Sequence, residues 1–290
     1  MFKNSIWLNV FFSLLITALI SLMINALTPS FAWAWGKTGH RVVGKIAEHH
    51  LTAQTQIALQ PLLQGESLAS IANWADEQRS NPDRFWQKES GRWHYINLNT
   101  PSEFNPKRYS ASAKKAHIKD AYHVIIKSID VLKNKRTSVE EKRFYLRFLT
   151  HVVGDVHQPL HVGHADDHGG NKISVRFFGS ETNLHTLWDS KLIDYTQLSY
   201  SELSQFINTQ DIQTIQQHLD SQPHEWILES FKLAQSIYQV SNDDHRYRYV
   251  YQHMPTVKSR LTAAGLRLAG VLNAIFDPTA VPLIEAIPNL

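Results

Sequence analysis

The amino-acid sequence predicts a mostly α-helical protein, folded as a single compact domain with one small β-hairpin. Apolar residues recur at helical spacing over most of the chain, whereas the alternation typical of a strand is confined to Ile173, Val175 and Phe177. With 43% hydrophobic and 19% charged residues the chain can bury a core, which excludes a disordered protein. No repeat, linker or change of composition divides it.

Start and stop signals place the predicted helices in order. Thr52 and Ser67 are positioned to cap two helices, and Ser138 begins a capping box with Glu141. Pro159 ends the helix that follows Ser138. The predicted helices cover residues 40–51, 52–63, 67–79, 112–133, 138–157, 186–196, 200–208, 223–240 and 256–275.

Two stretches are predicted to be loops. Residues 81–111 contain three prolines, and within them we expect a short extended piece at 93–98. Residues 161–171 end in Gly169-Gly-Asn171. Gly179, which follows the alternating stretch, predicts the turn of the hairpin.

Residues 1–34 are predicted to be a secretory signal peptide. Lys3 is followed by a mostly apolar stretch, and Ala32-Trp-Ala34 matches a signal-peptidase site. We therefore expect cleavage after Ala34, a mature domain over 35–290, and a secreted or periplasmic protein that no longer contacts the membrane. The apolar stretch is also long enough for a retained membrane anchor, which is the alternative.

The chain has 16 histidines and no cysteine. The missing cysteine excludes disulfides, thiolate metal sites and a cysteine nucleophile. An exported chain without disulfides is typical of bacteria. With 29 basic and 26 acidic residues the protein is nearly balanced in charge, so imidazole chemistry, and metal binding above all, is the first possibility to test.

Two His-x-x-x-Asp pairs are the most informative pattern. His151 and Asp155 lie four residues apart in a predicted helix, so both side chains face one side, and His185 and Asp189 repeat the spacing. His161 lies between the pairs, just past Pro159. Imidazole and carboxylate without sulfur suit Zn²⁺, and less specifically Mn²⁺ or Fe²⁺. A single pair is more often a surface hydrogen bond, and spacing alone assigns no role to His40, Asp76 or His94.

The sequence resembles the zinc-dependent single-strand nuclease family of the S-one/P-one type, as a bacterial member. The motifs that carry the resemblance are Trp35-Gly-Lys-Thr-Gly-His40, Trp74-Ala-Asp76, His94-Tyr-Ile-Asn97, His151-Val-Val-Gly-Asp155-Val-His-Gln-Pro-Leu-His161, Gly169-Gly-Asn171 and Asn183-Leu-His185-Thr-Leu-Trp-Asp189. The family fold is helical and shared with phospholipase C.

The resemblance implies three zinc ions in one cluster. Carried over by position, the first zinc ligands are Asp76, His94, His151 and Asp155. The second ion takes the α-amino group and carbonyl of Trp35, with His40 and a bridging Asp155, so signal-peptide cleavage is required. The third takes His161, His185 and Asp189.

The resemblance also implies a reaction and residues that contact the substrate. Zinc-bound hydroxide would attack the phosphorus of single-stranded DNA or RNA and leave 5′-phosphate products, with 3′-nucleotidase activity besides. Asp155 and Arg79 would be catalytic, Arg79 by holding the phosphate. Tyr95 would stack on a base. Asn97 and Asn99 replace carboxylates of the fungal enzymes, which changes the donors available to a base.

Two alternatives remain, and some histidines are unassigned. A zinc phospholipase C would share the fold and cluster, but there the first histidine lies further from the tryptophan and the last ligand is glutamate. A non-enzymatic periplasmic zinc-binding protein would not need a bridging carboxylate. His164 and His168 lie in the loop beside the predicted ligands, and the sequence assigns them no role. No stable protein partner is implied.

Overall fold

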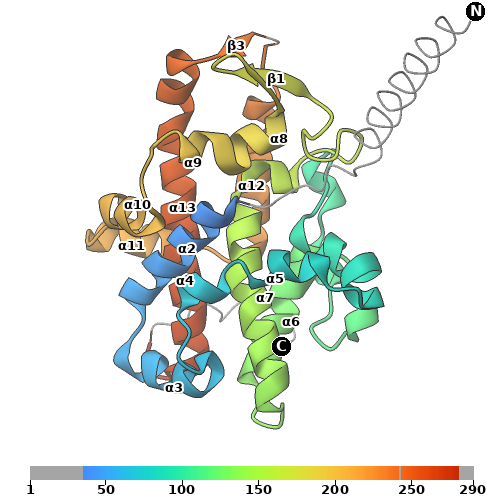
Figure 1. Ribbon diagram of the computed structural model, residues 1–290. Helices are drawn as coiled ribbons and strands as arrows, with labels where there is room; N and C mark the ends of the chain where they lie inside the picture. The colour runs from blue at the N-terminus through green and yellow to red at the C-terminus, as the bar shows by residue number, and fades with distance from the viewer. Residues whose placement is uncertain (1–34, 242, 281–290) are drawn as a thin grey trace, which may run out of the picture. The chain divides into compact units, whose positions relative to one another are not determined.

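Two long helices, α7 (Val139–His157) and α13 (Tyr247–Phe276), run through the centre of the fold (Figure 1). This computed structural model describes residues 35–241 and 243–280. The first helix of the described region, α2 (Lys37–His50), packs on α13, and α6 (Ala121–Lys133) packs along α7. The predicted signal peptide lies outside the described residues. Within the described part of the chain, no helix combines the length and hydropathy needed to span a membrane.

The prediction of a mostly helical protein with a small hairpin is confirmed. The remaining α-helices are α3 (Ala53–Leu63), α4 (Leu68–Ile71), α5 (Trp74–Glu77), α8 (Leu184–Thr186), α9 (Leu192–Asp194), α10 (Tyr200–Ile207), α11 (Ile212–Leu219) and α12 (Pro223–Ile237). Shorter 3₁₀ or π turns are η1 (Gln78–Ser80), η2 (Phe85–Glu89), η3 (Ser90–His94), η4 (Pro101–Glu103), η5 (Pro106–Arg108), η6 (Lys115–His117), η7 (Pro159–Val162) and η8 (Leu187–Lys191).

The hairpin forms a small sheet at one end of the helices (Figure 1). Strands β1 (Ser174–Phe177) and β2 (Ser180–Asn183) pair antiparallel, with Phe177 opposite Ser180. A two-residue strand, β3 (Asp244–His245), pairs parallel to β1 and was not predicted. Gly179 has a φ of +81°, which explains the glycine at this turn.

The predicted caps are confirmed at three helix starts. The side chains of Thr52, Ser67 and Ser138 each accept a hydrogen bond from the backbone three residues on. The helix predicted over 67–79 is interrupted between α4 and α5, at Ala72 and Asn73. This interruption matters for the site, because the Ala72 carbonyl accepts a hydrogen bond from a histidine instead of continuing the helix.

Other predicted boundaries of loops and helices differ from those of the structure. The stretch 81–111 contains helical turns, and Trp93 and His94 belong to η3, not to an extended segment. Helix α6 begins at Ala121, not at 112, because the Asp120 side chain caps it by accepting from His123 N at 3.0 Å. Helix α11 was missed.

Helix α13 begins nine residues before the predicted start and contains Pro255. A proline inside a helix removes one backbone hydrogen bond, and here the helix continues through it. Its second half is buried without interruption from Arg260 to Leu272, so packing in the core outweighs the local cost of the proline.

Candidate metal centre

Helix α7 supplies the residues around which the site is built. His151 and Asp155 lie one turn apart on α7 and are both fully buried. The predicted side-chain ligands outside α7 come from α2, α5, η3, η7, α8 and η8. The structure brings all eight predicted side-chain ligands, those of α7 included, into three buried groups, each able to offer three ligand atoms within 4.8 Å of one another: His40, His151 and Asp155; Asp76, His94 and His151; and His161, His185 and Asp189.

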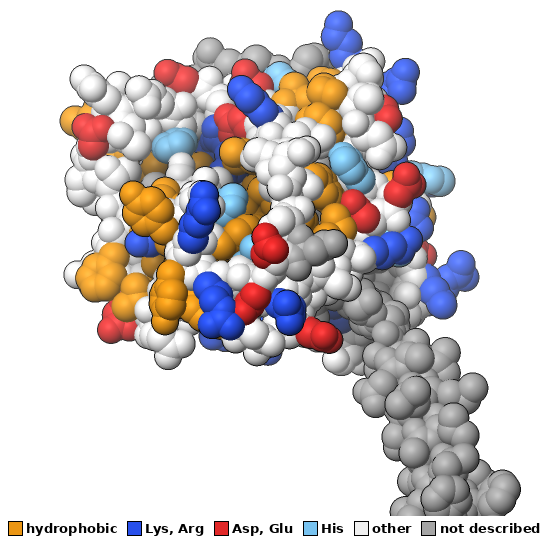
Figure 2. Space-filling model, turned by 90° about the horizontal axis from the view of Figure 1, so that it is seen from above, with side chains coloured by type: hydrophobic (Ala, Val, Ile, Leu, Met, Phe, Trp, Pro, Cys, Tyr) orange, Lys and Arg blue, Asp and Glu red, His pale blue; other side chains and the backbone are white. Residues whose placement is uncertain are grey.

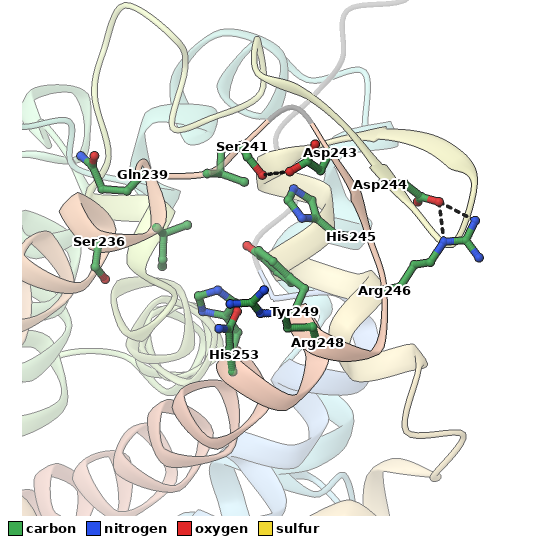
Figure 3. A pocket seen from close by; sticks show the side chains of 13 residues that line it. Ser236, Gln239, Ser241, Asp243, Asp244, His245, Arg246, Arg248, Tyr249 and His253 are labelled. Atoms are coloured by element: carbon green, nitrogen blue, oxygen red, sulfur yellow. Dashed lines mark hydrogen bonds and ion pairs between the residues drawn. The ribbon is translucent and has the colours of Figure 1, made fainter.

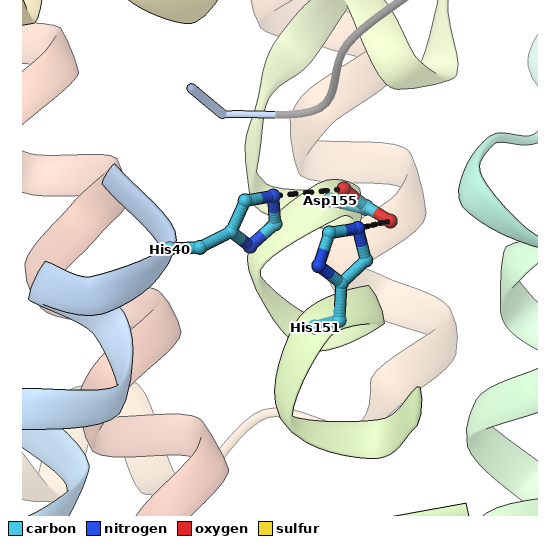
Figure 4. A group of neighbouring side chains, drawn as sticks. All are labelled: His40, His151 and Asp155. Atoms are coloured by element: carbon cyan, nitrogen blue, oxygen red, sulfur yellow. Dashed lines mark ion pairs between the residues drawn. The ribbon is translucent and has the colours of Figure 1, made fainter. Parts of the chain in front are cut away.

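In the first group, Asp155 lies between two histidines (Figure 4). Its Oδ1 is 3.4 Å from His40 Nε2, and its Oδ2 is 3.3 Å from His151 Nε2. The two imidazole rings stack with their centroids 3.9 Å apart. The two oxygens of one carboxylate therefore face two different histidines.

The second group meets the first at Asp155 and His151. His94 Nδ1 lies 3.2 Å from Asp155 Oδ2 and 2.9 Å from His151 Nε2. Asp76 Oδ1 lies 3.9 Å from His94 Nδ1 and 3.8 Å from His151 Nε2. Asp155 thus presents Oδ2 to this group and Oδ1 to His40, the arrangement needed for a carboxylate that bridges two ions.

The third group lies where η7 meets α8 and η8. Asp189 Oδ2 is 3.0 Å from His185 Nε2, one helical turn away in sequence. His161 Nε2 is 3.9 Å from Asp189 Oδ1, while His161 Nδ1 is 3.8 Å from Asp155 Oδ1. His161 therefore stands between the third group and the other two.

Backbone carbonyls fix the orientation of three of the histidines. Each donates its Nδ1 hydrogen to a carbonyl oxygen at 2.6 Å: His151 to Ala72, His161 to His94, and His185 to Gly169. A neutral imidazole that donates from Nδ1 carries its lone pair on Nε2. These partners are of the kind that orients metal-binding histidines, and they aim each Nε2 at a carboxylate.

Burial opposes charge on the groups of this site. Burial, followed by the neighbouring charge of His151, lowers the pKa of His40 well below its usual value. The same two causes lower the pKa of His94. Burial and then the nearby Asp76 raise the pKa of Asp155 well above its usual range. A cation held between these groups would reverse the cost of ionising the carboxylate.

The donor set fits a divalent cation. Asp155 Oδ1, Asp189 Oδ2 and His40 Nε2 are buried, and none makes a hydrogen bond within the described part of the chain. Lone pairs of imidazole and carboxylate then face each other, and a buried acceptor without a donor is costly. Zn²⁺ accepts nitrogen and oxygen ligands of this kind.

Trp35 begins the described chain beside these groups. Its side chain is fully buried, and a Cβ added to Gly154 would lie 3.8 Å from Trp35 Cδ1 and 2.8 Å from His40 Nδ1. The next residue, Gly36, donates its backbone N–H to Asp189 O at 2.8 Å. The residue predicted to offer its backbone as a ligand thus packs against α7 next to His40.

The predicted substrate residues lie around the second group. Arg79 Nη2 is 2.8 Å from Asp76 Oδ1, so this guanidinium contacts a predicted ligand directly. Tyr95 directly follows His94 and is 37% exposed. Asn97 is partly exposed and Asn99 exposed, while Ile96 and Leu98 between them are buried, so the three polar side chains share the outer side.

Of the two unassigned histidines of the loop, His164 has structural contacts and His168 is exposed. His164 stacks on Tyr238, with the ring centroids 4.3 Å apart, and lies 3.9 Å from Asp167. Tyr238 donates to Asp167 Oδ1, which also accepts from Gly170 N at 2.7 Å. These contacts support the loop whose Gly169 carbonyl orients His185. His168 is exposed and has a φ of +55°.

A cavity of about 330 Å³ lies where α13 begins (Figure 3). Among the described residues that line it are His245, Tyr249 and His253, and no predicted ligand is among them. Tyr249 accepts a hydrogen bond from Trp188 Nε1 at 2.9 Å, so the cavity wall touches the residue before Asp189.

Comparison with known proteins assigns the site to a family. A model of the S1/P1 nuclease family matches residues 35–277, which include every predicted ligand from Trp35 to Asp189. The chain belongs to the S1/P1 nuclease family. This S1/P1 nuclease is therefore a hydrolase, and the resemblance seen in its motifs is confirmed.

Named relatives of this S1/P1 nuclease include plant and fungal enzymes. It is 31% identical to endonuclease 4 of Arabidopsis thaliana over 284 residues, which cover 85% of this chain and 90% of that protein. It is 35% identical to nuclease P1 of Penicillium citrinum over 177 residues, 58% of this chain and 63% of that protein. Nuclease S1 of Aspergillus oryzae is 29% identical over 192 residues, 62% of this chain and 63% of the relative.

Proposed function

We propose that this S1/P1 nuclease is a zinc-dependent endonuclease that hydrolyses single-stranded DNA and RNA to 5′-phosphate products, with 3′-nucleotidase activity. The observation that carries the proposal is the set of three buried His/Asp groups linked through Asp155 and His161. Family membership supports the nuclease chemistry, and the absence of cysteine is consistent with nitrogen and oxygen ligands.

The groups provide ligands for three zinc ions. Asp76, His94, His151 and Asp155 would hold one, and His161, His185 and Asp189 another. The ion beside His40 would take Asp155 Oδ1 and the backbone of Trp35, whose amino group is available only after cleavage of the preceding residues. When bound, the zinc ions would supply a nucleophile at neutral pH and positive charge for the scissile phosphate.

The formal charge of the chain is only weakly positive, although the proposed substrate is a polyanion. On the face seen in Figure 2, Lys and Arg side chains are interspersed with Asp and Glu side chains. The full chain has a formal net charge of only +3. Substrate attraction would therefore depend on the bound cations more than on a basic patch.

Arg79 and Tyr95 would position the substrate beside the close pair of ions. The Arg79 guanidinium lies 2.8 Å from the Asp76 carboxylate and has a planar fork suited to phosphate oxygens. Tyr95 is partly exposed next to His94 and would stack on one base, while Asn97 and Asn99 on the same side offer amides to base edges. A base inside a duplex cannot stack on a protein ring, so this requirement favours single strands.

The proposal includes export. Residues 1–34 would act as a cleaved signal peptide and deliver a secreted or periplasmic enzyme that begins at Trp35. The buried position of Trp35 next to His40 and Gly154 supports a role for the new N-terminus in the site.

One experiment separates this proposal from its alternatives. Exported protein would be assayed on a single-stranded oligonucleotide, the matching duplex and phosphatidylcholine, with zinc content measured on the same sample. We expect about three zinc ions per chain, 5′-phosphate products and faster cleavage of the single strand. Cleavage of phosphatidylcholine alone would indicate a phospholipase, and full zinc content without any hydrolysis would indicate a zinc-binding protein.

A further inference from the structure

Gln158 is a fully buried polar residue to which the proposed function assigns no role. It lies at the junction of α7 and η7, where it ends one helix and begins the next turn. Its side-chain Oε1 accepts from Leu160 N at 2.6 Å, and its Nε2 donates to Asp189 Oδ1. The amide therefore connects the end of α7 to a ligand of the third group.

The orientation of this amide is fixed by its partners. A backbone N–H can only donate, so Oε1 must face Leu160 and Nε2 must face Asp189. The opposite orientation would place an amide hydrogen against the Leu160 N–H and an oxygen against a carboxylate. The atom that donates to Asp189 is thus the amide nitrogen Nε2.

This hydrogen bond makes the two oxygens of Asp189 differ in their partners. Oδ1 is engaged by Gln158, while Oδ2 lies 3.0 Å from His185 Nε2 and makes no hydrogen bond to any described residue. His185 donates from Nδ1 to Gly169 O, so its Nε2 lone pair also points toward Oδ2. Of the two oxygens of Asp189, Oδ2 is then the one left for a cation, and it lies beside Nε2 of His185.

The backbone of Gln158 connects the same residue to the other groups. Its N–H donates to Asp155 O at 3.0 Å, and its carbonyl accepts from His161 N at 3.0 Å. One residue therefore contacts Asp155, His161 and Asp189, which belong to the two parts of the predicted cluster.

We propose that Gln158 is a positioning residue with two effects. It leaves Asp189 a single oxygen with which to bind zinc, and it fixes the position of the third group relative to Asp155. The inference rests on the proposed function, because it concerns the zinc ligands named there. Three single-atom protein ligands leave a coordination position open on a zinc ion, which is typical of catalytic sites. A two-oxygen Asp189 would fill the position that a phosphate oxygen of the substrate needs.

The test compares Gln158→Met with Ser230→Ala in the mature protein that begins at Trp35. Methionine has a similar length but donates nothing to Asp189. Ser230 is equally buried and donates its hydroxyl to Val156 O at 2.5 Å, near the same end of α7, without contacting a ligand. Zinc per chain would be measured by elemental analysis over a series of buffers with defined free zinc, together with thermal unfolding and oligonucleotide cleavage.

We expect Gln158→Met to bind one of its three zinc ions about 10- to 100-fold more weakly than the wild type, the usual cost of losing an outer hydrogen-bond partner. The other two ions and the zinc curve of Ser230→Ala should match the wild type. Added zinc should restore part of the cleavage rate of Gln158→Met, which a general loss of folding would not allow.

A second variant separates loss of the amide donor from misfolding. Gln158→Glu keeps an acceptor for Leu160 N but places an oxygen against Asp189, so it should lose the same single zinc ion. Unchanged zinc curves in both folded variants, or equal weakening of all three ions, would overturn the role of Gln158. A wild type that binds no third zinc ion would overturn the proposed function itself, and the two failures are therefore distinct.

Discussion

Asp155 Oδ1 and His40 Nε2 face each other across 3.4 Å in a space closed to solvent, and neither atom makes a hydrogen bond to any described residue. The other oxygen of Asp155 faces His94 and His151 at 3.2 and 3.3 Å. A buried carboxylate arranged in this way is costly to ionise, and a cation between its oxygens and the histidines would offset that cost.

Asp155→Asn should abolish the bridge while keeping the shape of the side chain. An amide is a poor ligand for two cations, so we expect zinc content to fall and nuclease turnover to drop by several orders of magnitude. Asp130→Asn is the matched control, since the partly exposed Asp130 of α6 pairs with Lys127 and is not among the predicted ligands. Turnover of Asp155→Asn close to that of the control would contradict the bridging role.

Gly154→Ala should displace His40. A Cβ at Gly154 would lie 2.8 Å from His40 Nδ1, closer than real Cβ contacts allow, so the ring must move. We expect about 10-fold or greater loss of zinc affinity or activity, measured by zinc titration and oligonucleotide cleavage. Gly91→Ala provides the control, because a Cβ there meets no atom within 4 Å. Equal behaviour of the two variants would mean that the ring position of His40 is unimportant.

Tyr95→Ala should weaken substrate binding more than folding. Base stacking contributes about 1–3 kcal/mol, so KM for a single-stranded oligonucleotide should rise roughly 5- to 150-fold. Tyr251→Ala removes a tyrosine that is 84% exposed on α13 and should leave KM unchanged. A KM that stays at the wild-type value in Tyr95→Ala would show that the base stacks elsewhere.

Glu229→Gln should destabilise the protein in a pH-dependent way. Burial opposes the charge of Glu229, but hydrogen bonds from Arg267 and Arg260 outweigh it and lower its pKa from 4.5 to about 2. At a pH between about 2 and 4.5, Glu229 is therefore protonated in the unfolded chain but still ionised in the folded protein. The stabilisation that its charge provides is fully present above pH 4.5 and is lost as the pH falls through about 2.

Urea unfolding of the wild type and of Glu229→Gln at a series of pH values would measure this effect. The other titrating groups contribute equally to both proteins, so their contributions cancel in the difference between the two free energies of unfolding. We expect the difference to be largest near neutral pH and to shrink steadily on acidification below pH 4.5. A difference that is constant across this range would assign the effect to packing.

The sequence predicted the parts of the site that depend on local geometry. His151 and Asp155 share a face because they lie four residues apart in one helix, and Ser138 and Pro159 bound that helix. Spacing alone could not assign His40, Asp76 or His94, because they come from other helices; their motifs and order identified the family.

The supporting residues could not be predicted from local signals. The Ala72 carbonyl contacts His151 because the helix breaks there, and the break depends on packing against α7. Gln158 contacts Asp189 only after η7 and η8 meet in the fold. A glutamine before a proline carries no sequence signal for such a role. The last helix was predicted to begin at 256, whereas α13 begins at Tyr247 and continues through Pro255.

We propose that the N-terminus created by cleavage before Trp35 completes a zinc cluster with His40 and Asp155. The most direct measurement compares two exported proteins that differ by one extra residue before Trp35, with zinc content and cleavage of a single-stranded oligonucleotide measured on each sample. We expect about three zinc ions and 5′-phosphate products for the protein that begins at Trp35, and a large loss of both zinc and activity in the extended form. Equal zinc content and equal cleavage in the two forms would contradict this proposal.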